Sequence, residues 1–233
     1  MFGFLFSALL ATTSLAGVGK IIRVEGSQDA QINRVGAKIP MQVEGDLEEG
    51  DEIETNNSVV VLHLYPSTQI SLNKNSKLQI TQALIQESDV GEESTSVIKL
   101  LKGLIRLQVI KEINQKINQE VNVGDVSFGV RGTDFEVNAN DTSEVDLDVY
   151  EGEVTVTSPH VQTFVPEVVK ASEGFRFSRK QKQFIRRKFQ PKFKNHPGFL
   201  DKVSLRERWK KIRPDKMRKV IKLRNKKQTR KQR

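Results

Sequence analysis

The side chains that most often perform catalysis are scarce in this chain. Its 233 residues include no cysteine, which excludes thiol nucleophiles, disulfides and zinc–thiolate sites. The histidines His63, His160 and His196 stand far apart, and the sequence contains no serine-nucleophile elbow, glycine-rich phosphate loop or zinc-protease motif. We therefore predict a protein that is not an enzyme and that carries no cofactor and no metal.

A cluster of acids is the best candidate for binding a divalent cation through oxygen ligands. Its spacing does not match an EF-hand loop, and the glycines beside it favour a solvated bend. Residues 138–141 offer a weaker set of oxygens, for which a plain hairpin turn is the favoured interpretation. The clustered acids are Asp46, Glu48, Glu49, Asp51, Glu52 and Glu54.

Positive charge is concentrated at the C-terminal end of the chain. Residues 176–233 hold 25 of the 38 lysines and arginines but only three of the 29 acids, so their formal charge is +22. Residues 1–175 then carry −13, and the two parts together give the net charge of +9. We therefore expect an acidic domain with a strongly basic extension, which excludes a uniformly basic protein.

The basic extension, residues 178–233, interleaves aromatic with basic side chains and is divided by prolines. Residues 205–212 and 215–223 could each form about two turns of helix, too short to be stable alone. This composition favours binding of a polyanion by counterion release. A solvated flexible tail and docking on the acidic domain, within the chain or between copies, are the alternatives. The candidate polyanion-binding residues are Arg186, Arg187, Lys188, Trp209, Lys210, Lys211, Arg218 and Lys219.

Residues 1–16 have the features of a signal peptide. They carry no charged side chain, include an apolar run over residues 2–11, and place Ser14 and Ala16 before a possible cleavage site at Gly17. The apolar run is shorter than the roughly 20 residues of a membrane span. We predict export to the periplasm or out of the cell, with an uncleaved anchor and a segment that is no signal as the alternatives.

Residues 17–177 repeat short β-strand patterns separated by turn residues. The strongest strand candidate is the stretch 58–65, SVVVLHLY, which is rich in β-branched side chains. Near-minimal turns favour pairing between neighbours in the chain. We predict an all-β fold of many short strands in stacked hairpins, solenoid-like or sandwich-like, followed by a partly helical or disordered basic tail.

Two stretches of this pattern carry specific predictions. Residues 109–118 suit either a helical face or a long strand, and their β-branched content favours the strand. Gly103 is predicted to form a turn between strands at 97–101 and 104–110, because glycine adopts positive φ without strain.

Three blocks, read in order, resemble the FecR family. They are GDLEEGDEIET at residues 45–55, IKLLKGLI at 98–105, and the pair VRGTDFEV at 130–137 and VYEGEVTV at 149–156. The pair is the most specific of the three. The residues that carry the resemblance are Gly50, Asp51, Gly103, Arg131, Gly132, Thr133, Phe135 and Gly152.

Residues 131–134 could be taken as a ligand site, because they concentrate polar groups between apolar strands. A structural role is the favoured interpretation. In that role Gly132 supplies a bulge, Arg131 hydrogen-bonds nearby carboxylates or carbonyls, and Phe135 enters the core.

The resemblance implies an extracytoplasmic β-domain over roughly residues 17–160. Residues 66–68, Pro-Ser-Thr, stand where the family usually has Asp-Gly-Ser, so that turn must be built differently. Family members that restrain a sigma factor have a cytoplasmic helical segment and a membrane span before the β-domain. Here the β-pattern begins about two residues after the predicted cleavage site, so the resemblance does not carry over sigma-factor control.

These observations predict a signal peptide at 1–16, a FecR-like β-domain at 17–177 and a basic tail at 178–233. The predicted function is that of a non-catalytic extracytoplasmic interaction protein, whose tail tethers it to anionic envelope polymers or lipids or to an acidic envelope protein. A periplasmic signalling component that contacts an envelope receptor or a membrane regulator is the alternative. Nucleic acid is an expected partner only if residues 1–16 are not a working signal.

Overall fold

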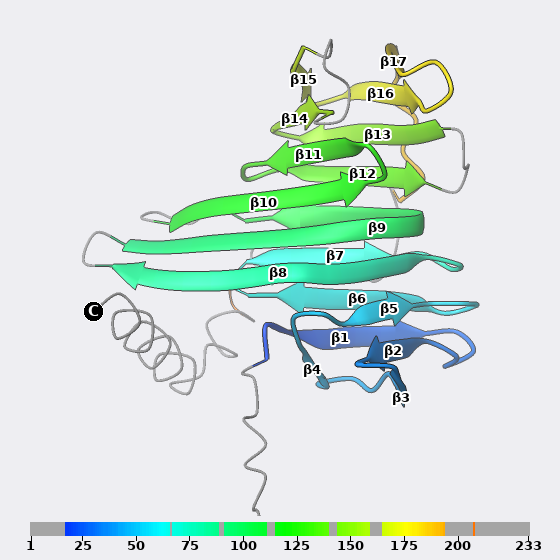
Figure 1. Ribbon diagram of the computed structural model, residues 1–233, viewed down its shortest axis with the longest axis vertical. Helices are drawn as coiled ribbons and strands as arrows, with labels where there is room; N and C mark the ends of the chain where they lie inside the picture. Colours follow the sequence, from blue (N-terminus) through cyan, green and yellow to red (C-terminus); the bar gives the residue numbers. More distant parts are fainter. Residues whose placement is uncertain are drawn as a thin grey trace, which may run out of the picture.

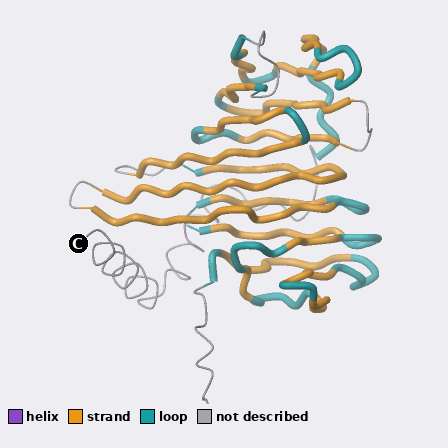
Figure 2. Tube along the Cα trace, in the orientation of Figure 1, coloured by secondary structure: helices purple, strands orange, loops and turns teal. Residues whose placement is uncertain are grey.

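The computed structural model describes residues 17–65, 67–88, 91–110, 115–139, 144–158, 165–193 and Glu207. Within these residues the fold is all-β, as the sequence predicts (Figure 1). Strands make up most of the described chain and are joined by short loops (Figure 2).

The described residues form seventeen strands, and hydrogen-bonded pairing connects all of them. The pairings define two sheets that share β9. In spatial order, the first sheet contains β4 (Asp46–Leu47), β1 (Gly19–Glu25), β6 (Val59–Leu64), β7 (Thr68–Leu72), the second part of β9 (Gly91–Val109), β12 (Asp134–Ala139), β13 (Glu144–Glu151), β16 (Glu173–Ser178) and β17 (Gln183–Lys188). The second sheet contains β3 (Ala37–Pro40), β2 (Gln31–Arg34), β5 (Glu52–Glu54), β8 (Lys77–Ser88), the first part of β9, β10 (Gln115–Val123), β11 (Val126–Val130), β14 (Glu153–Thr157) and β15 (Glu167–Lys170).

The strands are stacked in chain order along the long axis of the molecule, from β1–β4 at one end to β16 and β17 at the other (Figure 1). From β10 onward the chain places two strands in one sheet and the next two in the other. The described strand pairs are antiparallel except for β9 and β10, which are parallel. This layering follows from the short connections, which place each strand close to the one before it.

The core lies between the two sheets. Side chains alternate between the two faces of a strand, so every second residue of β6, namely Val60, Leu62 and Leu64, enters the core. The hydroxyl of Thr68 in β7 donates to Oε1 of Gln119 in β10 at 3.1 Å, and this buried bond links the two sheets through the core.

The prediction of a turn at Gly103 is wrong. β9 continues through Gly103 and passes there from the second sheet into the first. Gly103 has a φ of 103°, and the hydroxyl of Ser76 accepts the N–H of Leu104 at 3.1 Å. The glycine therefore bends the strand between two sheets without reversing the chain, because its backbone can adopt positive φ at little cost.

The stretch 109–118 falls on the end of β9 and the start of β10. β9 ends at Val109, residues 111–114 lie outside the described residues, and the part from Gln115 onward is strand.

The folded strands extend past residue 177, where the sequence predicts the β-domain to end. β17 pairs with β16, and the ring centroid of Phe184 lies 5.0 Å from that of Phe175 and 4.6 Å from that of Phe177. Phe193 is also buried, at 2% exposed. These apolar contacts bind residues 178–193 to the sheets, so the folded domain includes the chain at least as far as Phe193.

The predicted signal peptide and most of the chain after Phe193 lie outside the described residues. Among the residues that are described, no helix has the length and apolar character needed to span a membrane.

Candidate interaction site on the outer face of the first sheet

Acidic side chains lie on the outer face of β12 and β13. Val137 and Leu147 enter the core, so the alternating residues Glu136 and Asp148 face away from it. Both carboxylates are nevertheless buried, at 1% and 2% exposed. A buried carboxylate needs hydrogen-bond donors, and the segment that follows β17, residues 189–193, supplies them.

Glu136 holds the end of this segment. Its Oε1 accepts the backbone N–H of Lys192 at 2.7 Å, and its Oε2 accepts the backbone N–H of Phe193 at 2.9 Å. The hydroxyl of Tyr150 donates to the same Oε2 at 2.6 Å. Hydrogen bonds to a charged acceptor contribute about 1.5–3 kcal/mol each, so Glu136 is the principal anchor of the segment.

Asp148 binds the chain just before this anchor. Its Oδ1 accepts the backbone N–H of Gln190 at 2.9 Å, and its Oδ2 pairs with the guanidinium of Arg187. Gly174 of β16 lies between these partners, opposite Asp148 on one side and Arg187 on the other. A Cβ at Gly174 would stand 3.1 Å from both Cγ and Nη1 of Arg187, so glycine leaves room for the arginine.

Arg106 of β9 joins the segment to the sheet. Its Nε and Nη2 each donate to Asp134 at 2.8 Å, and its Nη1 donates to the carbonyl oxygen of Phe193 at 3.1 Å. The guanidinium carbon lies 3.8 Å from the ring centroid of Tyr150, which is a cation–π contact. Burial, together with the hydrogen bond to Glu136, raises the pKa of Tyr150 above its usual value, so the hydroxyl stays a donor.

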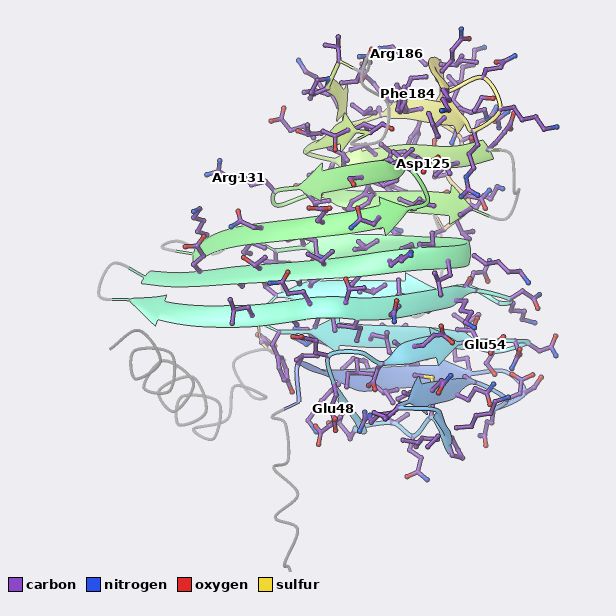
Figure 3. All side chains as sticks on the ribbon, in the orientation of Figure 1. Glu48, Glu54, Asp125, Arg131, Phe184 and Arg186 are labelled. Carbon is purple, nitrogen blue, oxygen red and sulfur yellow. The ribbon has the colours of Figure 1, made fainter. Side chains whose placement is uncertain are left out.

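Arg186 closes one end of the sandwich (Figure 3). Its Nη2 donates to Glu167 of β15 in the second sheet, and its Nη1 donates to Glu173 of β16 in the first sheet, each at 3.0 Å. The N–H of Lys170 and, after it, the charge of Arg186 lower the pKa of Glu173. The side chain of Arg186 is 55% exposed, so each of these ion pairs contributes about 1 kcal/mol or less.

Three of the predicted polyanion-binding residues therefore lie in β17. Arg186 and Arg187 are paired with acids of their own chain, while Lys188 is exposed and has no ion pair with another described residue. At these positions the extension lies against its own acidic domain, which the sequence left open as an alternative. The other candidates, Trp209, Lys210, Lys211, Arg218 and Lys219, lie outside the described residues.

Gly50 and Asp51 belong to the acidic bend that precedes β5. Gly50 has a φ of 95°, and Asp51 is fully buried. Arg34 donates to the two oxygens of Asp51 at 2.7 and 2.8 Å and to Glu48 at 2.6 Å. The cation held by this bend is therefore an arginine; within the described residues, no group of three His, Asp or Glu side chains is arranged to hold a metal.

Residues 131–135 carry the chain from β11 into β12. Gly132 has a φ of 66°, and Phe135 is fully buried in the core. The bulge in the β12–β13 ladder falls between Asp134 and Phe135, just after Gly132. Arg131 is exposed and points away from the sheets (Figure 3), and no hydrogen bond or ion pair joins it to another described residue.

Thr133 and Gly152 pack against each other at the same corner. A Cβ at Gly152 would stand 2.7 Å from Cγ2 of Thr133, and Gly152 also has a positive φ of 80°. Thr133 is fully buried, and its carbonyl oxygen accepts the N–H of Val109 at 2.8 Å. In the structure Thr133, Phe135 and Gly152 thus make backbone and packing contacts between the two sheets.

Of the three histidines, the structure describes His63. His63 lies in β6 and is 1% exposed, and its ring meets that of Tyr65 edge-on at a centroid distance of 5.7 Å. His160 and His196 lie outside the described residues.

Sequence reasoning missed Glu136, Asp148 and Arg106. In the sequence these residues alternate with apolar neighbours, and such a pattern is typical of a strand with one solvated face. Their burial depends on residues 189–193, which follow about 40 or more positions later in the chain. The usable signal was the pair of acids flanked by apolar residues in DFEV and DLDV together with the basic stretch that could cover them.

The fold and this site define a two-sheet β-domain that holds the first part of its own basic extension. Residues 51–155 match the family model described as FecR protein, which confirms the resemblance predicted from the sequence. No curated protein matches the chain.

Two solved crystal structures are similar to this chain, each of a proposed anti-sigma factor from Parabacteroides distasonis ATCC 8503. Their sequences are 16% and 15% identical to this one, and the TM-score is 0.48 for both. Each match covers 60% of this chain and 60% of the other chain. Similarity at this level supports no inference about partners or activity.

Proposed function

We propose that this chain is a non-catalytic extracytoplasmic interaction protein with a FecR domain, tethered through its basic segment after Phe193 to anionic envelope polymers or lipids or to an acidic partner. The observation that carries the proposal is how the positive charge is divided. Arg186 and Arg187 are paired with acids of the domain, whereas residues 194–233 contain 17 further basic residues and three acids. Most of the positive charge that supports tethering therefore lies after Phe193.

The physical basis of the tether is counterion release. A dense run of lysines and arginines that meets a polyanion displaces condensed counterions, so binding weakens as salt rises. The signal-peptide features of residues 1–16 support a location where lipid head groups, lipopolysaccharide and cell-wall polymers are the available polyanions.

A signalling role is the second candidate, and the FecR match at residues 51–155 favours it. In this role the β-domain would contact an envelope receptor or a membrane-bound regulator. Neighbouring genes for a receptor and a sigma factor would raise this candidate above tethering, and their absence would leave tethering as the better proposal.

The tether is tested by measuring how strongly the full chain is retained on anionic vesicles and on purified cell wall across a salt series. The test variant replaces Lys210, Lys211, Arg218 and Lys219 with glutamine. The matched control replaces four exposed lysines of the β-domain, Lys38, Lys74, Lys99 and Lys102. We expect the test variant alone to bind more weakly with a shallower salt dependence; equal losses in both variants, or binding that ignores salt, would refute the tether.

Export is tested separately by the N-terminal residue of the mature protein. Gly17 is expected as the new N-terminus. An intact Met1 in a soluble cytoplasmic fraction would exclude both envelope roles, whatever the basic segment binds.

A further inference from the structure

The outer face of the first sheet continues from Glu136 across β9 and β7 to β6. The strand registers arrange its side chains in two rows. One row contains Val61, Ser71, Arg106 and Glu136, and the other contains His63, Gln69, Gln108 and Asp134.

The part of this face on β6 and β7 is buried as deeply as the core. Val61 is 1% exposed, and Gln69 and Ser71 are 0% exposed, although all three point away from the core cluster. The outer face of the second sheet behaves differently, since Glu153 and Thr155 of β14 are exposed there. A sheet face with nothing on it leaves alternate residues in water, so the face of β6 and β7 is covered.

Among the described residues, the segment 189–193 bonds to the neighbouring part of this face. Its contacts run to Asp148 of β13, Glu136 of β12 and Arg106 of β9. Phe193 is held by Glu136 through its N–H and by Arg106 through its carbonyl oxygen, so the chain that follows starts beside β9.

We infer that residues 194–213 of this chain dock on the outer face of β6, β7 and β9. β6 lies two strand spacings from β9, about 10 Å, a span that a few residues cover at about 3.3 Å each. The inference is independent of the proposed tethering, since it concerns where the segment rests on its own domain.

The composition of the segment suits this face. Leu205, Trp209 and Ile212 recur at the spacing of one helix face, and Val61 and Leu104 provide apolar surface on the sheet. Opposite net charges also favour docking, because residues 17–193 carry 21 basic and 26 acidic residues, while residues 194–233 carry 17 and three.

Thiol labelling of the full chain tests the inference, because the natural sequence has no cysteine. Ser71→Cys places a thiol of similar size under the proposed segment, and Thr155→Cys places a control thiol on the exposed face of the second sheet. We expect alkylation at position 71 to be slower than at position 155 by about tenfold or more. Adding Leu205→Asp and Trp209→Asp should bring the two rates together while circular dichroism stays unchanged.

Three results would overturn the inference. The first is equal labelling at positions 71 and 155 in the full chain, and the second is protection that survives the changes at Leu205 and Trp209. The third is protection that increases with protein concentration, which would assign the face to a second copy of the chain.

Fluorescence of Trp209 gives an independent measurement, because it is the single tryptophan of the chain. We expect its emission to be blue-shifted and shielded from acrylamide, and Ser71→Lys to shift the emission to the red. Thr155→Lys, the matched change on the second sheet, should leave the emission where it is. Solvent-exposed emission from the unchanged chain would contradict docking, whether or not Ser71→Lys folds.

Discussion

Arg187 binds the buried carboxylate of Asp148 across Gly174, which has no side chain to block the path. The ion pair spans from β17 over β16 to β13, so it fixes the edge of the first sheet to a strand that is not its neighbour. An arginine that composition alone assigns to polyanion binding therefore has a partner within its own domain.

Gly174→Ala should lower the free energy of unfolding by about 2 kcal/mol. The added methyl group stands against Arg187 and the carbonyl oxygen of Lys188, and displacing the arginine removes a charge-assisted hydrogen bond from Asp148. Urea unfolding followed by circular dichroism measures the loss. Gly129→Ala in β11 is the control, since a Cβ there comes no nearer than 3.7 Å to another residue's atom; an equal effect of both changes would contradict the role of Gly174.

Glu136→Gln should release residues 189–193 from the sheet. The neutral amide is a weaker acceptor for the N–H groups of Lys192 and Phe193, and a loss of about 3 kcal/mol corresponds to roughly 100-fold faster local opening. Hydrogen exchange at these two amides reports the change. Glu120→Gln, at an exposed position of β10, should leave both rates unaltered; unchanged exchange in Glu136→Gln would show that the carboxylate does not hold the segment.

Tyr150→Phe should change how stability depends on alkaline pH. The pKa of Tyr150 is raised in the folded state, so its protonated form contributes stability that is present below the ordinary tyrosine pKa of about 10 and is lost as pH rises above it. The free energy of unfolding of the natural chain should exceed that of the variant by about 1.5 kcal/mol at neutral pH. This difference should become smaller above about pH 10. Denaturant unfolding at several pH values measures this difference. A difference in unfolding free energy that increases at alkaline pH would contradict the predicted effect of the raised pKa of Tyr150.

Gly103→Ala should be among the most destabilising glycine changes in the domain. The added methyl group would overlap Ser76 at the point where β9 passes between the sheets, and the positive φ adds strain. Gly36→Ala shares a positive φ of 82° but meets no atom within 4 Å, so it should cost only about 1 kcal/mol. Chemical unfolding of both variants separates the effect of steric overlap with Ser76 from that of backbone strain. Similar losses of unfolding free energy in the two variants would show that Ser76 moves to make room for the added methyl group.

Much of the fold could be predicted from the sequence because short strands leave a local pattern. Alternation of apolar and polar residues together with glycine-rich turns indicated an all-β domain, and the block at 130–137 indicated the FecR resemblance. The predicted turn at Gly103 was wrong because the local sequence is compatible with two structures. A glycine with positive φ fits a turn between two strands and a bend within one strand equally well, and Gly103 forms the bend.

The candidate site depends on contacts between distant positions. Lys192 and Phe193 bind Glu136 from 56 and 57 residues away, and only the strand order places them together. By itself, the amino-acid sequence determined the strand content, the family resemblance and the split between an acidic domain and a basic extension, because each is a property of neighbouring residues. Only the tertiary structure decided which basic residues the domain binds, since that depends on which buried carboxylates meet them across the sheet.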